Sequence, residues 1–130
     1  MNIDPRSHIP IYLQIVDAVR SAIAAGVYRP GETLPSLRAL ALELHVNPNT
    51  VQRAYDELER EGLVYSERGK GLFVAEGGTK AAQAHARLSV VHRFEDVLRT
   101  AAGAGISAAE AREIFDAAAK SFVQTKGQRE

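Results

Sequence analysis

The sequence predicts a mainly α-helical fold that contains one small β-hairpin. Apolar residues recur every three or four positions through most of the chain, which gathers them on one face of successive helices. Between residues 63 and 75 the apolar period falls to two, which is typical of short strands. Gly77-Gly78-Thr79 looks like a linker before an alanine-rich stretch. We therefore expect one domain over residues 1–76 and a two-helix tail over residues 77–130.

The composition is that of an ordinary globular chain. Hydrophobic residues make up 45% and charged residues 25% of the 130 positions. The absence of cysteine excludes disulfides, thiolate catalysis and cysteine-ligated zinc. The chain has no run of about 18 apolar residues, as a membrane span would need, and its N-terminus lacks the basic start and apolar core of a signal peptide. We therefore expect a cytoplasmic protein.

The charge balance by itself does not point to a nucleic-acid partner. The net charge is zero, and residues 1–76 hold 8 Lys and Arg against 10 Asp and Glu. A neutral protein can still present a locally basic face. Arg38, Arg53, Arg68 and Lys70 lie in segments that could converge on one surface.

The first helix is expected over residues 11–25. It follows an irregular lead-in that ends at Pro10, its apolar stripe faces a core, and Gly26 closes it. Pro30-Gly31 then marks a turn. Thr33-Leu34 should be extended, because a residue before proline avoids the helical region.

Two further helices follow in close succession. Ser36 can cap a short helix over Leu37–Leu44. A tight turn leads to a second helix within Asn47–Gly62, for which Asn47 is the expected cap. Two short helices joined by about four residues, the second with a polar exposed face, predict a helix-turn-helix. An ordinary amphipathic surface helix is the plainer alternative for the second segment taken alone.

The polar face of that second helix suits contact with DNA bases. Arginine matches the paired acceptors of guanine, and asparagine and glutamine match adenine in the major groove. The face carries Asn49, Thr50, Gln52, Arg53 and Asp56.

A β-hairpin is expected directly after the helix-turn-helix. Residues 63–67 and 71–75 read as strands, and Arg68-Gly69-Lys70 is the turn between them. A hairpin in this place predicts a wing with a basic tip, whose glycines let the backbone approach a neighbour such as DNA. A plain hairpin that closes a small core is the alternative. The spacing of a phosphate-binding loop is absent, and no helix follows the turn.

The tail predicts a hairpin of two helices, from Lys80 to about Ala102 and from Ala108 to about Val123. Gly103-Ala104-Gly105 separates them, and Ser107 with Glu110 forms a capping box for the second. Such a pair buries little apolar surface alone, so we expect a dimer interface, with folding back on the first domain as the alternative. The expected interface residues are Leu88, Val91, Phe94, Leu98, Ile114, Phe115 and Phe122.

No residue pattern indicates an enzyme, because a nucleophile, a base and oxyanion donors cannot be assembled from this sequence. His85 and His92 could share a helix face, but two ligands without a nearby carboxylate make a weak metal site. We expect no metal and no cofactor. Two rival functions stay open: a sensor whose tail binds a small-molecule effector, for which the tail offers few polar groups, and a winged domain used for protein contact.

Three motifs in order resemble the GntR family of bacterial transcription regulators. They are G-x-x-L-P-S-x-R-x-L-A at Gly31–Ala41, N-x-x-T-V-x-x-A-Y at Asn47–Tyr55, and G-x-G-x-F-V at Gly69–Val74. The resemblance covers about residues 9–76 and implies a winged helix-turn-helix that binds a double-stranded DNA operator. The 54 residues after Glu76 are similar to the short tail of the YtrA branch. That likeness implies a homodimeric repressor on a pseudo-palindromic operator.

The resemblance also implies which residues contact DNA. In the family, the serine and the arginine at the start of the first helix of the motif hold phosphate, and the arginine also contacts a base edge. The wing tip of relatives enters the minor groove. Pro48 stands where several relatives carry Arg or Lys, which removes a potential base contact. The implied contacts are Ser36, Arg38, Asn47, Asn49, Thr50, Gln52, Arg53, Arg68, Gly69 and Lys70.

Overall fold

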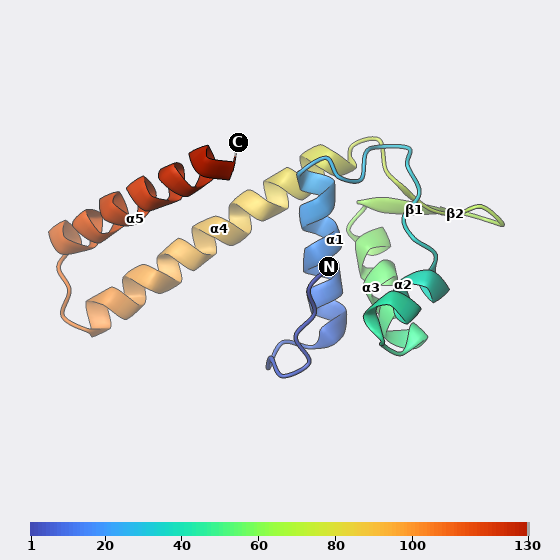
Figure 1. The fold of residues 1–130 in the computed structure, drawn as a ribbon, viewed down its shortest axis with the longest axis horizontal. Coiled ribbons are helices and arrows are strands. Elements are labelled where there is room, and N and C mark those ends of the chain that lie inside the picture. The colour runs from blue at the N-terminus through green and yellow to red at the C-terminus, as the bar shows by residue number, and fades with distance from the viewer. Residues whose placement is uncertain (130) are drawn as a thin grey trace. The chain divides into compact units, whose positions relative to one another are not determined.

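The computed structural model describes residues 1–129, and the side chains of residues 1–124. Within this range the chain is mainly helical with one small β-hairpin, as the sequence predicts (Figure 1). Contacts between residues divide it into two units, Met1–Leu88 and Ser89–Glu130. The elements are α1 (Ile11–Ala24), α2 (Leu37–Leu44), α3 (Pro48–Arg60), β1 (Val64–Glu67), β2 (Gly71–Val74), α4 (Gly78–Gly103) and α5 (Ala108–Arg129).

The core of the first unit forms where the apolar faces of α1, α2 and α3 meet. Ile15 and Ile23 of α1, together with Val51 and Leu58 of α3, are completely buried. The two residues of each pair are about two helical turns apart, so one face of each helix supplies them. The opposite face of α3 is therefore left to solvent.

Both helices of the predicted helix-turn-helix begin at the expected caps. The Ser36 hydroxyl accepts a hydrogen bond from the Ala39 N–H at 3.1 Å, and the Asn47 side-chain oxygen accepts one from the Asn49 N–H at 2.8 Å. Between them, His45 takes a left-handed conformation with φ of 55°, which ends α2. These bonds fix the turn and hence the direction in which α3 leaves it.

The hairpin is antiparallel, and its strands are paired from Val64 opposite Val74 to Glu67 opposite Gly71. The Lys70 N–H donates to the Glu67 carbonyl at 3.0 Å, and Gly69 has a φ of +79°. A residue with a side chain rarely takes that conformation, so glycine lets the tip turn tightly. The extended piece expected at Thr33-Leu34 is present as a bridge between Thr33 and Phe73.

The start of α4 differs from the expected linker. Gly78 is the first residue of the helix and is buried, and Ala82 one turn later is part of the core of the first unit. A Cβ atom on Gly78 would lie 2.8 Å from the Leu63 carbonyl oxygen and 3.1 Å from a methyl carbon of Val74. Glycine is used here for close approach between backbones rather than for flexibility. The first of the two units defined by contacts between residues includes this start of α4 and ends at Leu88.

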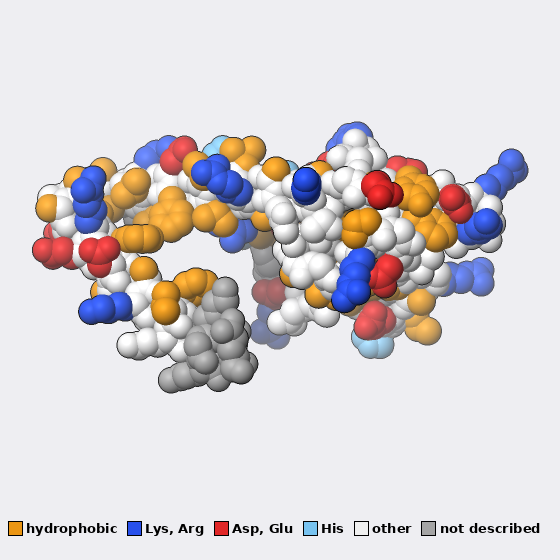
Figure 2. Space-filling model, turned by 90° about the horizontal axis from the view of Figure 1, so that it is seen from above, with side chains coloured by type: hydrophobic (Ala, Val, Ile, Leu, Met, Phe, Trp, Pro, Cys, Tyr) orange, Lys and Arg blue, Asp and Glu red, His pale blue; other side chains and the backbone are white. Residues whose placement is uncertain are grey.

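The second unit is a hairpin of two helices. Ser107 caps α5, because its hydroxyl accepts a hydrogen bond from the Glu110 N–H at 3.2 Å. Phe94 of α4 and Phe115 of α5 meet edge to face with ring centroids 5.8 Å apart. Hydrophobic side chains gather along this hairpin (Figure 2). None of the helices that residues 1–129 form is both long and apolar enough to cross a membrane.

Candidate nucleic-acid interface

The N-terminal half of α3 presents polar side chains to solvent. Asn49, Gln52 and Arg53 are exposed, whereas their neighbours Val51 and Ala54 are completely buried. Successive residues of an α-helix are about 100° apart around its axis, so the burial of one face fixes the rotation of α3. The polar side chains therefore cannot turn inward. We call Asn49, Thr50, Gln52 and Arg53 the reading face, and it is thus formed on a rigid element.

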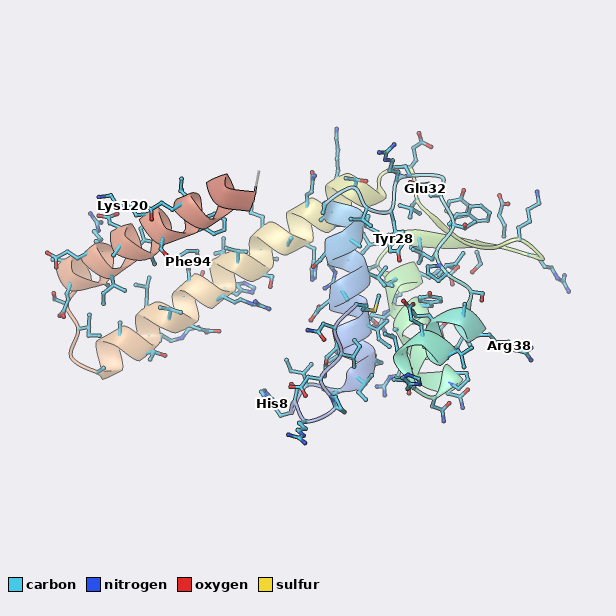
Figure 3. All side chains as sticks on the ribbon, viewed as in Figure 1. His8, Tyr28, Glu32, Arg38, Phe94 and Lys120 are labelled. Carbon is cyan, nitrogen blue, oxygen red and sulfur yellow. The ribbon has the colours of Figure 1, made fainter. Side chains whose placement is uncertain are left out.

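The start of α2 supplies two further side chains of the predicted set. Ser36 and Arg38 are both exposed, and Arg38 extends away from the helix (Figure 3). The Arg38 guanidinium makes no hydrogen bond or ion pair with any residue that the structure describes. Its five N–H donors are therefore free for an external acceptor.

The tip of the hairpin carries Arg68 and Lys70, both exposed. The Lys70 ammonium lies 4.0 Å from the Glu67 carboxylate, and 73% of the lysine side chain is exposed. An exposed pair of this kind is weak. A phosphate group can therefore compete for the lysine.

A groove of about 470 Å³ lies between the start of α2, one side of α3 and the hairpin. We call it the wing groove, and it brings together Ser36, Gln52 and Lys70 from three separate segments. Acidic side chains also line it, namely Asp56, Glu59 and Glu67. Of the four basic residues that the sequence analysis expected to converge, Lys70 lines this groove, and the acidic wall was not expected.

A second groove, of about 440 Å³, lies where the start of α1 meets the start of α3. We call it the α1 groove. Arg38 and Arg68 line neither groove. The α1 groove is lined by Ile11, Tyr12, Asn47, Asn49, Thr50 and Arg53.

Two members of the predicted reading face already have partners within the chain. The Gln52 amide donates to an Asp56 carboxylate oxygen at 2.8 Å. The Arg53 guanidinium carbon lies 3.8 Å from the centre of the Tyr12 ring, in a cation–π contact. The Gln52–Asp56 spacing of four is a known helical pairing that the sequence could have revealed. No local pattern indicates Tyr12, which reads only as an apolar position of the first helix.

Tyr55 ties α3 to the segment that leads into α2. Its hydroxyl donates to the Pro35 carbonyl at 2.8 Å, and Tyr55 is 6% exposed. Burial raises the pKa of this hydroxyl well above its usual range, and the nearby Tyr28 and Glu43 raise it further. Tyr55 therefore stays a neutral donor and holds the reading face at a fixed distance from the start of α2.

Residues 11–74 match the sequence model of the bacterial regulatory proteins of the gntR family. A GntR family transcriptional regulator from Listeria monocytogenes superimposes on the chain with a TM-score of 0.73 at 32% identity, over 88% of this chain and 97% of that chain. The chain belongs to the GntR family. The family resemblance that the three motifs predict is therefore confirmed.

Other GntR relatives match a shorter part of the chain. The HTH-type transcriptional repressor YtrA of Bacillus subtilis (strain 168) is 47% identical over 76 residues, which is 58% of this chain and 58% of that repressor. The structure of AraR(DBD) in complex with operator ORX1 superimposes with a TM-score of 0.53 at 31% identity, over 58% of this chain and 93% of that chain. The predicted likeness to YtrA is confirmed, over less than two thirds of the length of that protein.

Proposed function

We propose that this GntR chain is a transcription regulator that binds a double-stranded DNA operator as a homodimer and represses transcription there. One observation supports this above all: Asn49, Gln52 and Arg53 are held outward on α3, beside a hairpin with a basic tip. The operator in the AraR(DBD) complex supports DNA as the partner. The name of the YtrA repressor supports the direction of regulation.

In this proposal α3 lies in the major groove and the hairpin is the wing. Asn49 and Gln52 offer the amide groups that pair with adenine, and Arg53 offers the fork that pairs with guanine or phosphate. The proposed contacts also include Ser36 and Arg38, as the resemblance implies. The basic tip of the wing suits a narrow groove or the phosphates beside it.

The homodimer is proposed from the apolar surface of α4 and α5. All seven side chains predicted for the interface are exposed in the single chain, from 36% for Val91 to 68% for Phe122. An exposed apolar surface of this extent marks a contact site in a soluble protein. A second copy that covers it by two-fold symmetry would present two α3 helices to a pseudo-palindromic operator.

Selection of bound fragments from the source genome, by the full chain at physiological salt, tests the proposal. We expect one shared pseudo-palindrome, with half-sites about one helical turn apart. Gln52→Ala should change the selected bases. Replacement of Arg68 and Lys70 together by alanine should weaken binding to all sites. The number of phosphate contacts, which the salt dependence of binding measures, should fall by up to about two.

The possible results separate the parts of the proposal. Absence of any enriched sequence would overturn DNA recognition by α3. A selected site without two-fold symmetry would overturn the homodimer on DNA but not the reading face. A site whose occupation raises transcription of the adjoining gene would overturn repression alone.

A further inference from the structure

Tyr12 lies outside the helix-turn-helix, yet it contacts one of its reading residues. The Tyr12 ring of α1 stands 3.8 Å from the Arg53 guanidinium carbon of α3. Tyr12 is half-buried and rests against the core, so the ring itself is held in place. It also lines the α1 groove together with Asn47, Asn49, Thr50 and Arg53.

The usual helical partners of Arg53 are already occupied. An arginine on a helix pairs most readily with acids three or four positions away, and those positions hold Asp56 and Glu57. Asp56 accepts a hydrogen bond from Gln52 at 2.8 Å. Glu57 forms an ion pair with Arg60. Among the described residues, the Tyr12 ring is therefore the group that holds the Arg53 guanidinium.

A stacked guanidinium keeps its hydrogen-bonding capacity. The guanidinium carbon lies over the ring at stacking distance, 3.8 Å from its centre. In a stacked guanidinium all five N–H donors point outward within its own plane, away from the ring. A long arginine side chain loses much conformational freedom when it is ordered by a ligand. A ring that orders it beforehand lowers that cost and strengthens binding without any contact between the ring and the ligand.

We infer that Tyr12 is a positioning residue for DNA recognition, which holds Arg53 at the α1 edge of the reading face so that its N–H fork meets a pair of acceptor atoms on DNA. The inference rests on the proposed function, since it needs an operator. It extends the interface beyond α2, α3 and the wing to the first helix of the domain. Acceptor pairs of this kind are offered by guanine and by the phosphate group.

The test is a double-mutant cycle on operator affinity with the full chain. Tyr12→Leu should weaken binding by about threefold to tenfold. In the Arg53→Ala background the same change should have almost no effect, because no guanidinium is left to position. Tyr12→Phe keeps the ring face and should bind as the unaltered chain does. Thermal unfolding of every variant checks that the fold is retained.

Arg38→Ala provides the matched control. It also removes an arginine from the proposed interface, but Arg38 does not line the α1 groove that Tyr12 and Arg53 share. Tyr12→Leu should weaken binding by the same factor in the Arg38→Ala background and in the unaltered chain. If Tyr12→Leu reduced the folded fraction, Tyr12→Met would replace it in the cycle, because methionine also lacks the ring and its flexible side chain adapts to an irregular space.

The outcomes distinguish this inference from the proposed function. A chain that selects no operator at all overturns the proposed function before Tyr12 is tested. A chain that binds its operator, but loses the same affinity on Tyr12→Leu with and without Arg53, overturns the positioning role. A loss that occurs only when Arg53 is present supports it. An accompanying change in base preference then identifies guanine as the acceptor, and a lower salt dependence identifies phosphate.

Discussion

At the level of single residues, the proposed DNA contacts differ in how far the free protein already orders them. Ser36 and Asn47 are engaged as helix caps, and Gln52 and Arg53 are held by Asp56 and Tyr12. Arg38 has no such partner in the described part of the chain. Substitution of Arg38 should therefore report a contact with DNA with little effect on the fold.

Arg38→Ala should lower operator affinity by about 1–3 kcal/mol if the guanidinium makes a bidentate base contact. The measurement is fluorescence anisotropy with the selected operator at a fixed, moderate salt concentration. Arg38→Lys, which keeps the charge without the fork, should recover only part of the loss. Unchanged affinity in Arg38→Ala would remove this residue from the set of base contacts.

Asp56 has two opposing effects on DNA that a pair of substitutions can separate. Its charge repels phosphate, while its acceptor oxygen fixes the Gln52 amide at 2.8 Å. Asp56→Asn removes only the charge, because the asparagine oxygen can still accept from Gln52. Asp56→Ala removes both.

We expect both Asp56 variants to bind all DNA more tightly than the unaltered chain, with a steeper salt dependence. We also compare the binding free energies of the operator and of a site changed at the base that Gln52 contacts. The difference between these two free energies should be smaller in Asp56→Ala than in Asp56→Asn, by about 0.5–1.5 kcal/mol. Competition binding with the two DNA sites measures the difference. Equal discrimination by the two variants would show that the hydrogen bond has no part in orienting Gln52.

The Tyr55 hydroxyl predicts a loss of stability in alkali. Its pKa is raised in the folded protein, chiefly by burial, whereas tyrosine in an unfolded chain ionises near pH 10. The stability that this pKa shift contributes is thus fully present below about pH 10. It decreases above that pH, because only the unfolded chain loses the tyrosine proton there. Urea denaturation between pH 7 and about 11 should show this decline.

Tyr55→Phe should be less stable than the unaltered chain near pH 7, by about 1 kcal/mol, because the hydrogen bond to the Pro35 carbonyl is lost. Above about pH 10 its free energy of unfolding should fall less steeply, so the two curves converge. Parallel curves would mean that Tyr55 ionises equally readily in both states.

At the level of elements, α1 and the C-terminal end of α3 are joined by an ion pair. The Arg20 guanidinium donates to both carboxylate oxygens of Glu61, at 2.6 and 2.9 Å, and the two side chains are 12% and 23% exposed. The Nε of Arg20 is buried without a hydrogen-bond partner among the described residues. The pair fixes the angle of α3 at the end opposite to the reading face.

Glu61→Ala should destabilise the protein by about 1–3 kcal/mol, because it leaves a largely buried guanidinium whose remaining counter-charge among the described side chains is the exposed Asp17. Arg20→Met should be tolerated better, since it removes the charge and fills similar volume. Chemical denaturation with both variants gives the comparison. A greater loss in Arg20→Met would show that the Glu61 carboxylate left without its partner costs more than the uncompensated guanidinium.

The elements themselves were largely predictable, because their signals are local. The bounds of α2 and the cap of α3 follow from Ser36 and Asn47, and the wing follows from the change of apolar period. The contacts of Arg20 with Glu61 and of Tyr12 with Arg53 were not predictable, because each joins residues about forty positions apart. Periodicity identifies which face is buried and does not identify which polar side chains meet across it.

At the level of the whole molecule, the predicted tail helices are present, and the homodimer is tested through the exposed surface of the second unit. Phe94→Glu places a charge within the proposed interface, but Phe94 also contacts Phe115 of its own hairpin. Leu98→Glu is the cleaner variant, since Leu98 is 54% exposed and takes no part in that ring pair.

We expect Leu98→Glu to give monomers by light scattering, and to weaken operator binding through the loss of simultaneous contact with two half-sites. Val27→Glu is the matched control, because Val27 is 67% exposed and lies in the first unit. It should leave the oligomeric state unchanged. A dimeric mass for Leu98→Glu would locate the contact between copies away from this surface.

The close approach at Gly78 limits how members of the family can be recombined. A hybrid protein joined at residue 76 would bring a foreign side chain to the position 2.8 Å from the Leu63 carbonyl oxygen and would replace Ala82 in the core. Either change would disturb the base of the wing, where Leu63 and Val74 lie. A junction after Leu88 keeps about three turns of α4 with the reading domain. Exchange of tails between such regulators should therefore succeed at a junction after Leu88 and fail at a junction just before Gly78.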